Sequence, residues 1–134
     1  MAGLERLRPA PNHHLEIRDD PAKGRGIFTR EAIAAGVLIE AAPVVIIPPE
    51  QCAAVDRTVL HDYYFHWDGD PDGIGSGAVA LGLVSLCNHS RRPSARVRRN
   101  LARATLDLIA ARRIEVGEEI TIDYNCALWF EARE

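Results

Sequence analysis

Short stretches of alternating or β-branched residues run through the first third of the chain and predict strands. Residues 15–18 alternate apolar and charged side chains, which is typical of a strand with one buried face. Residues 37–40 and 44–47 are two apolar, β-branched runs separated by Pro43, and we expect each to be a strand. The chain therefore begins as a mainly β structure.

A glycine-flanked turn at residues 23–26 leads into a further short strand at Ile27 and Phe28. Gly24 and Gly26 allow a backbone path, and a close approach to a ligand, that side chains would block. A simple hairpin explains the same spacing. Both interpretations remain open at this point.

The middle of the chain changes character at Pro48 and Pro49, which end the β-branched run and suit the first turn of a short helix reaching to Leu60. An aromatic group follows, and we expect it to fill the core and to form a partly exposed edge. Its members are Tyr63, Tyr64, Phe65 and Trp67.

Polar clusters then follow apolar segments in the second half of the chain. Residues 78–86 are apolar and small, which predicts a buried strand or short buried helix leading to Asn88 and His89. Residues 105–111 predict a strand with Asp107 as its one charge, and a turn at Gly117 precedes a last strand at 120–122 that ends beside Tyr124. The tail, 126–134, is compatible with a helix that closes as a lid or plugs the core.

Length and composition favour one globular domain. The chain has 134 residues, of which 47% are hydrophobic and 26% charged, and no apolar run approaches the roughly 20 residues that span a bilayer. Residues 1–11 contain no segment of signal-peptide type, so we expect a cytoplasmic protein, or a nuclear one in a eukaryote. Cys52, Cys87 and Cys126 fit buried thiols better than a disulfide framework or zinc site.

Two ligand-binding interpretations are weaker. Residues 68–73 match the opening of a calcium loop, but Val79 stands at the twelfth position, where a glutamate should bind the metal, so a solvated acidic turn is favoured. His61 and His66 have no second cluster of ligands beside them, and no metal is expected.

Arginines form a local basic band in an otherwise acidic chain. Eight of them lie between residues 91 and 113, and Arg96 and Arg98 flank Val97 in strand alternation, which favours a solvated sheet face. The net charge of −3 and the lack of stacking aromatics nearby argue against a nucleic-acid partner.

Three motifs in order resemble the signature of SET-domain protein lysine methyltransferases. They are Gly24-Arg25-Gly26-Ile27-Phe28, then Asn88-His89-Ser90 with Pro93, then Gly117-Glu118-Glu119-Ile120-Thr121-Ile122-Asp123-Tyr124. The resemblance implies the SET-domain (β-clip) fold of small sheets with few short helices. In it, the C-terminal segment threads the Asn88 segment as a pseudoknot. It divides the chain into an N-terminal extension (1–14), the SET domain (15–125) with a variable insert at about 50–77, and a tail (126–134).

The resemblance also implies an activity and a set of site residues. S-adenosylmethionine would be the methyl donor and a protein lysine the acceptor. Gly24, Arg25 and Gly26 would meet the donor, with Arg25 reaching its carboxylate, and Asn88 and His89 would hold its amino-acid and adenine parts. Tyr124 would be the catalytic tyrosine. The substrate channel would be lined by Tyr63, Tyr64, Trp129 and Phe130.

Residue chemistry agrees with methyl transfer. Holding an amine in line with a sulfonium methyl group lowers the barrier by about 7 to 11 kcal/mol and needs little acid or base chemistry. A lysine of pKa about 10.4 must arrive neutral, which an apolar, aromatic channel favours. The hydroxyl of Tyr124 can orient the amine while it stays protonated.

Departures from the family pattern keep other functions open. Ser94 stands where the pattern N-H-S-x-x-P-N has asparagine, and Val97 occupies a place often held by an aromatic residue near the channel. A catalytically silent SET-like module that binds a peptide or the cofactor is therefore the first alternative, and a nucleic-acid or calcium-binding β domain is the second. The short C-terminus makes a homodimer plausible, in which a second subunit would close the channel.

Overall fold

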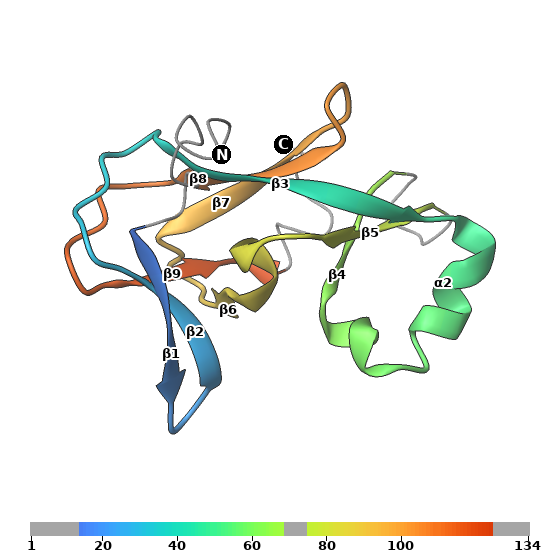
Figure 1. Cartoon of the computed structure of the whole chain (residues 1–134), viewed down its shortest axis with the longest axis horizontal. Helices are drawn as coiled ribbons and strands as arrows, with labels where there is room; N and C mark the ends of the chain where they lie inside the picture. Colours follow the sequence, from blue (N-terminus) through green and yellow to red (C-terminus); the bar gives the residue numbers. More distant parts are fainter. Residues whose placement is uncertain (1–13, 69–74, 125–134) are drawn as a thin grey trace, which may run out of the picture.

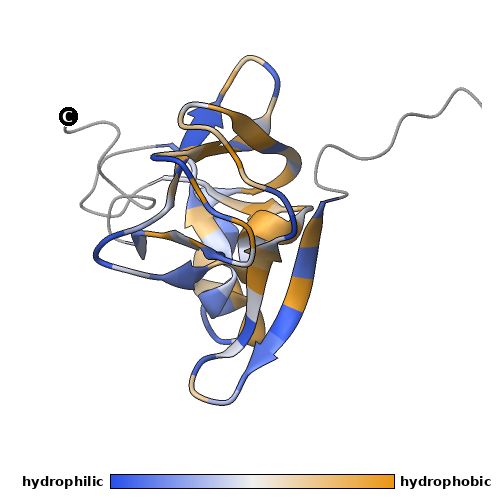
Figure 2. Cartoon of the chain, turned by 90° about the vertical axis from the view of Figure 1, so that its left-hand side faces the viewer, coloured by the Kyte–Doolittle hydropathy of each residue, from blue (hydrophilic) through white to orange (hydrophobic). Residues whose placement is uncertain are grey.

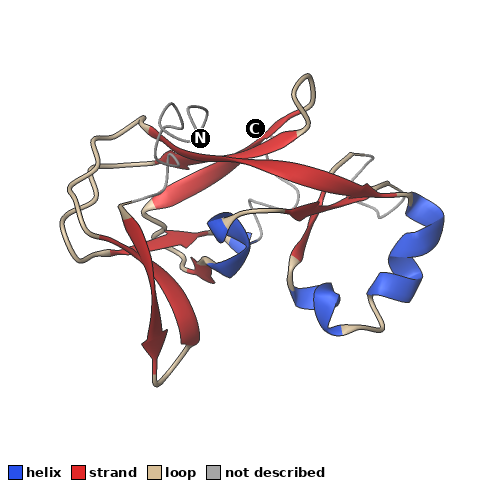
Figure 3. Ribbon diagram, in the orientation of Figure 1, coloured by secondary structure: helices blue, strands red, loops and turns tan. Residues whose placement is uncertain are grey.

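The computed structural model describes residues 14–68 and 75–124, which form two sheets and three short helical segments (Figures 1 and 3). The first sheet has the order β1-β2-β9-β6, and the second the order β4-β5-β3-β8-β7. In chain order the strands are β1 (Leu15–Asp20), β2 (Gly24–Thr29), β3 (Leu38–Ile47), β4 (Tyr64–His66), β5 (Gly77–Ala80), β6 (Asn88–His89), β7 (Ala95–Asn100), β8 (Thr105–Ala110) and β9 (Glu119–Ile122). The helical segments are α2 (Pro49–Val55), η1 (Val59–Asp62) and η2 (Leu83–Leu86). The expected mainly β architecture is confirmed.

The glycine turn is the tip of a hairpin. β1 pairs antiparallel with β2 from Leu15 opposite Thr29 to Asp20 opposite Gly24. Gly24 has a φ of 81°, a conformation that glycine adopts without steric cost. The carboxylate of Asp20 accepts a hydrogen bond from the backbone N–H of Ala22 at 2.7 Å, which fixes the turn.

The expected break at Pro43 is wrong, because β3 runs through it. The first half of β3 pairs with β8 as far as Pro43 opposite Thr105, and the second half pairs with β5 from Val44 opposite Ala80. Proline lacks a backbone N–H and is tolerated where ladder hydrogen bonding is interrupted. Pro43 lies at the change of partner, so one long strand serves two neighbours.

The expected helix from Pro49 to Leu60 is also shorter than predicted. α2 ends at Val55, and a separate 3₁₀ turn begins after Thr58, whose hydroxyl accepts from the N–H of Leu60 at 3.2 Å. The serine/threonine cap starts a new turn here and interrupts the continuous helix. Residues 78–86 combine both expected forms, with β5 followed by an exposed turn and then η2.

The core lies between the two sheets, and its apolar positions gather in the interior in Figure 2. Ile27, Leu106, Leu108 and Ile120 are fully buried. Phe65 and Trp67 join this core, whereas Tyr63 is exposed, as expected for the aromatic group. No helix within residues 14–68 and 75–124 has the length and apolar character needed to cross a bilayer.

Two segments far apart in sequence meet at β6 and β9. Asn88 pairs with Thr121 and His89 with Ile122 in parallel register. A parallel pair requires a crossover, so the chain between them must leave the sheet and return. Here it forms the β7–β8 hairpin on the way. The C-terminal motif is thereby placed against the Asn88 segment, as the resemblance implies.

Candidate functional site

A cavity of about 650 Å³ opens where the β1–β2 turn, the η2–β6 segment and the η1–β4 segment converge. Six of the residues expected in the site line it: Gly24, Arg25, Tyr63, Tyr64, Asn88 and Tyr124. Gly26 and His89 are not among its lining residues. Trp129 and Phe130 lie outside the described residues, so their expected place in the channel remains a prediction.

Glu40 positions the segment that carries Asn88, and sequence reasoning did not assign it a role. Its buried carboxylate accepts hydrogen bonds from the N–H groups of Leu83 and Val84, both at 2.9 Å. A Cβ at Gly82 would lie 2.8 Å from this carboxylate, so only glycine fits there. The oxygens of a carboxyl group can satisfy the backbone donors that begin a helical turn. The lone acid within an apolar strand was the available signal.

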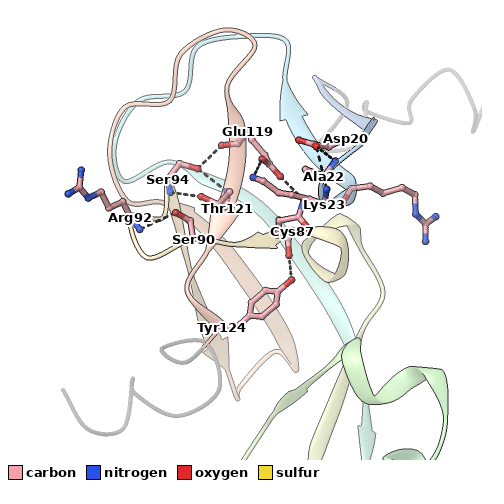
Figure 4. A network of polar contacts seen from close by, with 12 residues as sticks. Asp20, Ala22, Lys23, Cys87, Ser90, Arg92, Ser94, Glu119, Thr121 and Tyr124 are labelled. Carbon is pink, nitrogen blue, oxygen red and sulfur yellow. Dashed lines mark hydrogen bonds and ion pairs between the residues drawn. The ribbon is translucent and has the colours of Figure 1, made fainter.

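Asn88 is held by Glu119, a second residue that sequence reasoning left without a role. The Asn88 Nδ2 group donates to Glu119 Oε2 at 2.7 Å and to the carbonyl of Arg25 at 3.1 Å. Both amide hydrogens are thus used, and the amide oxygen remains an acceptor. The other Glu119 oxygen binds the Lys23 ammonium at 2.8 Å (Figure 4), and this hydrogen bond raises the pKa of Lys23.

Gly26 supplies the space for this arrangement. A Cβ built at Gly26 would lie 2.6 Å from Glu119 Oε2 and 2.9 Å from Asn88 Nδ2. In the structure, the space at Gly26 admits the side chains of Asn88 and Glu119. The close approach to a ligand that the glycine motif predicted stays a prediction.

Tyr124 is fixed at three points. Its hydroxyl donates to the carbonyl of Cys87 at 2.8 Å, and its backbone N–H donates to His89 Nδ1 at 3.0 Å. The rings of His89 and Tyr124 lie with their centroids 5.2 Å apart and their planes at 50° to each other. His89 therefore orients the tyrosine directly.

The hydroxyl of Tyr124 stays protonated near neutral pH, because burial raises the pKa of this phenol from its usual value near 10. Its hydrogen is used by Cys87, so the oxygen can act as an acceptor toward a group in the cavity. The cavity thus has a directed neutral acceptor, as Figure 4 shows for Tyr124 beside Cys87.

The opposite end of the cavity is aromatic and acidic. Tyr64 donates to Asp56 Oδ1 at 2.7 Å, and His61 Nδ1 lies 3.0 Å from the same oxygen. Burial, followed by the hydrogen bond to Asp56, raises the pKa of Tyr64 to about 12. The hydrogen bond from Tyr64 lowers the pKa of Asp56, which is therefore a carboxylate at neutral pH. Tyr63 and Asp62 complete this end.

Ser94 is well satisfied, although it departs from the family pattern. Its Oγ donates to the carbonyl of Glu119 at 2.9 Å and accepts from the N–H of Thr121 at 3.0 Å. Its own N–H donates to Thr121 Oγ1 at 3.1 Å (Figure 4). Ser94 thus forms a reciprocal pair of hydrogen bonds with β9, which ties the two motifs together.

Ser94→Ala is expected to lower the free energy of unfolding by about 1 to 3 kcal/mol, because the buried N–H of Thr121 would lose its partner. Chemical denaturation monitored by circular dichroism measures this. Ser90→Ala is the matched control, because the Ser90 Oγ accepts a hydrogen bond from the exposed N–H of Arg92 at 3.0 Å, and this donor can bind water in the variant. Equal stability of the two variants would contradict the role given to Ser94.

Val97, the second departure from the family pattern, is buried in β7 and packs in the core, and it does not line the cavity.

The calcium loop and the two histidines were the candidate metal ligands. Within residues 14–68 and 75–124 no group of three potential metal ligands is found. Asp68 accepts from the N–H and Oγ of Ser76, and the rest of the acidic loop lies outside the described residues.

Comparison with known proteins adds independent information. A family model, "SET domain", matches residues 24–125. The chain is 36% identical over 124 residues to a Schizosaccharomyces pombe histone-lysine N-methyltransferase specific for H3 lysine-37, covering 92% of this chain and 81% of that protein. It is 33% identical over 117 residues to a Yarrowia lipolytica histone-lysine N-methyltransferase specific for H3 lysine-36, covering 83% of this chain but 15% of that protein.

A solved structure shares the fold. The crystal structure of a candidate histone methyltransferase from Plasmodium falciparum superimposes with a TM-score of 0.64 at 27% identity. The match covers 83% of this chain and 92% of that one. Sequence and structure comparisons therefore point to the same family.

Proposed function

The chain belongs to the SET-domain family and is a protein lysine N-methyltransferase, and from this premise we propose that it uses S-adenosylmethionine to methylate a lysine of histone H3. The family membership supports the donor, and the two curated relatives support the substrate. The observation that carries the proposal is the charge distribution of the cavity. Arg25 and Lys23, which is paired with Glu119, line the cavity beside the β1–β2 turn, and Asp56 and Asp62 line it on the side of α2 and η1 (Figure 1).

The side of the cavity beside the β1–β2 turn offers partners for the amino-acid part of the donor. A cavity of about 650 Å³ is within the range of small-molecule sites. Asn88 offers its amide oxygen as an acceptor for the donor's ammonium group, and Arg25 offers a cation for its carboxylate. When bound, S-adenosylmethionine supplies an activated methyl group. The residues Gly24, Arg25, Asn88 and, as proposed from the family, Gly26 and His89 would hold it.

The acidic end fits a basic peptide. Histone tails carry many lysines and arginines, which the carboxylates of Asp56 and Asp62 attract. Tyr63 and Tyr64 provide an aromatic wall that disfavours the charged form of a lysine entering beside them. The oxygen of Tyr124 would accept from the lysine amine and align it with the methyl group, so catalysis is mainly positioning.

A histone substrate would place the enzyme in the nucleus, so we propose a nuclear location in place of the cytoplasmic default. The homodimer expected from the sequence remains a prediction. The silent-module alternative is weakened, because Ser94, one of the features on which it depended, is fully hydrogen-bonded.

The direct test combines donor binding with product formation. Isothermal titration with S-adenosylmethionine should show one site per chain. Incubation with labelled donor and recombinant histone H3 should then label H3. Lysine-36 and lysine-37 of H3 are replaced by arginine one at a time, and one of these two H3 variants should no longer be labelled. Binding without labelling of H3 would leave a methyltransferase with another substrate, whereas absence of donor binding would contradict the proposed cofactor.

Asp62→Asn is expected to raise the KM for an H3 tail peptide several-fold with little change in kcat, because it removes a rim charge that attracts a basic substrate. The effect should shrink above about 0.3 M salt as screening increases. Glu50→Gln is the control, since it removes one charge from the exposed surface of α2, away from the cavity lining. An equal change in KM for both variants would refute a local role for Asp62.

A further inference from the structure

The arginines that follow the site form a surface of their own. Residues 91–103 contain six arginines and no acidic residue, in a chain of net charge −3. Arg91, Arg92, Arg96 and Arg103 are exposed, and we call these four the arginine surface. Arg91 and Arg92 precede β7, Arg96 lies in it and Arg103 comes after it. β7 is an edge strand of the second sheet.

These four arginines differ from their neighbours in their ion pairing. Within the part of the chain that the structure describes, none of these four side chains forms an ion pair, whereas Arg98 in the same strand is paired with the buried Asp107 at 3.0 Å. Arg112 and Arg113, in the following turn, are likewise paired with Glu118 and Glu115. The arginine surface is thus set apart from the arginines that stabilise the fold.

The backbone holds this surface in place. The turn that carries Arg91 and Arg92 is closed by the bond from Arg92 N to Ser90 Oγ and anchored to β9 through Ser94. Figure 4 shows the side chain of Arg92 pointing away from the polar network. Arg96 follows on the outward face of β7, and Arg103 lies in the hairpin beyond its end. A six-residue strand is about 20 Å long, and Arg91 and Arg103 lie beyond the two ends of β7.

Exposed guanidinium groups on and beside one edge strand, with no ion pair to any described acid, are complementary to a linear polyanion. Guanidinium binds phosphate in a bidentate manner. Within residues 14–68 and 75–124 the exposed phenylalanine, tyrosine or tryptophan side chains are those of Tyr63 and Tyr124, which line the cavity and do not belong to β7. A basic histone tail would be repelled, so this surface would meet the other component of chromatin. We propose that the arginine surface binds the phosphate backbone of double-stranded DNA without sequence preference. This proposal departs from the expectation of no nucleic-acid partner, which rested on the net charge of −3 and on the lack of stacking aromatics near the arginines.

The surface also has a defined relation to the site. Arg91 comes two residues after His89, the last residue of β6, and Asn88 of the same strand lines the cavity. DNA bound at Arg91 would therefore lie close to the cavity. The choice of DNA among polyanions rests on the proposed histone substrate. DNA binding itself can be measured without any methylation, so failure of one proposal is distinguishable from failure of the other.

Fluorescence anisotropy of the full chain with a labelled 30-base-pair duplex tests the proposal. With about four phosphate contacts, the affinity should fall about 100-fold between 50 and 200 mM salt. The triple variant Arg91→Ala, Arg92→Ala, Arg96→Ala should flatten the plot of log affinity against log salt by about 0.9 per arginine removed. The double variant Arg112→Ala, Arg113→Ala, which removes ion-paired arginines, should keep the slope of the unmodified chain.

Activity provides the second measurement. The triple variant should methylate free H3 peptide as well as the unmodified chain does and should lose at least 10-fold on nucleosomes. Three results would overturn the proposal: binding without salt dependence, equal losses in the triple and double variants, or tighter binding to poly-glutamate than to DNA of equal charge. The last result would identify an acidic protein as the partner.

Discussion

Tyr124→Phe is expected to lower kcat about 100-fold and to leave the Kd for S-adenosylmethionine within about threefold. Phenylalanine keeps the ring that stacks near His89 at 5.2 Å but removes the oxygen that points an acceptor into the cavity. Loss of alignment at the reacting atoms costs about this factor, because positioning supplies most of the catalysis. Single-turnover kinetics with labelled donor separates this chemical step from binding.

The structure also requires a stability control for this variant. The carbonyl of Cys87 loses its donor in Tyr124→Phe, which costs about 1 kcal/mol of unfolding free energy. A thermal melt must therefore show a folded variant at the assay temperature. If the folded variant turns over at the normal rate, the hydroxyl has no role in aligning the amine.

Gly26→Ala is expected to weaken donor binding at least tenfold while the two sheets remain folded. The new methyl group would lie 2.6 Å from Glu119 Oε2 and 2.9 Å from Asn88 Nδ2, so both side chains must move. Displacing Asn88 removes the acceptor proposed for the donor's ammonium group. Isothermal titration gives the affinity, and circular dichroism shows whether the β structure persists.

Glu119→Gln provides a graded companion to this variant. It keeps the shape of the side chain that accepts from Asn88 but removes the charge that binds Lys23 at 2.8 Å. A smaller loss of affinity is expected, because a neutral acceptor can still orient the amide. If Gly26→Ala, the stronger of the two changes, leaves the affinity for S-adenosylmethionine unchanged, then Asn88 does not hold the donor.

Sequence alone predicted most of the strands because their signals are local. Alternation in residues 15–18, β-branched runs and glycine turns depend on neighbours in the chain, so β1, β2, β8 and β9 were found close to their real positions. The two errors were local signals overruled by partners. Pro43 is tolerated because β3 exchanges β8 for β5 there, and the helix after Pro49 stops because Thr58 caps a new turn.

The candidate site was predicted through motif spacing, and its supporting residues were not. Asn88 and Tyr124 were identified from the pattern of the family, and both line the cavity. Glu40 and Glu119 were missed because their partners are far away in the sequence. Glu40 and Leu83 are 43 residues apart, and Glu119 and Asn88 are 31 residues apart. No periodicity in the sequence records such a contact.

The sequence by itself determined the chemical groups, most of the strands and the family to which this enzyme belongs. Only the tertiary structure decided which of those groups face one cavity, that His89 orients Tyr124, and that Ser94 joins β9 to the turn before β7. The physical reason is the parallel pairing of β6 with β9, which brings together residues more than 30 positions apart. Such pairing depends on the burial of the whole core, which a local pattern cannot specify.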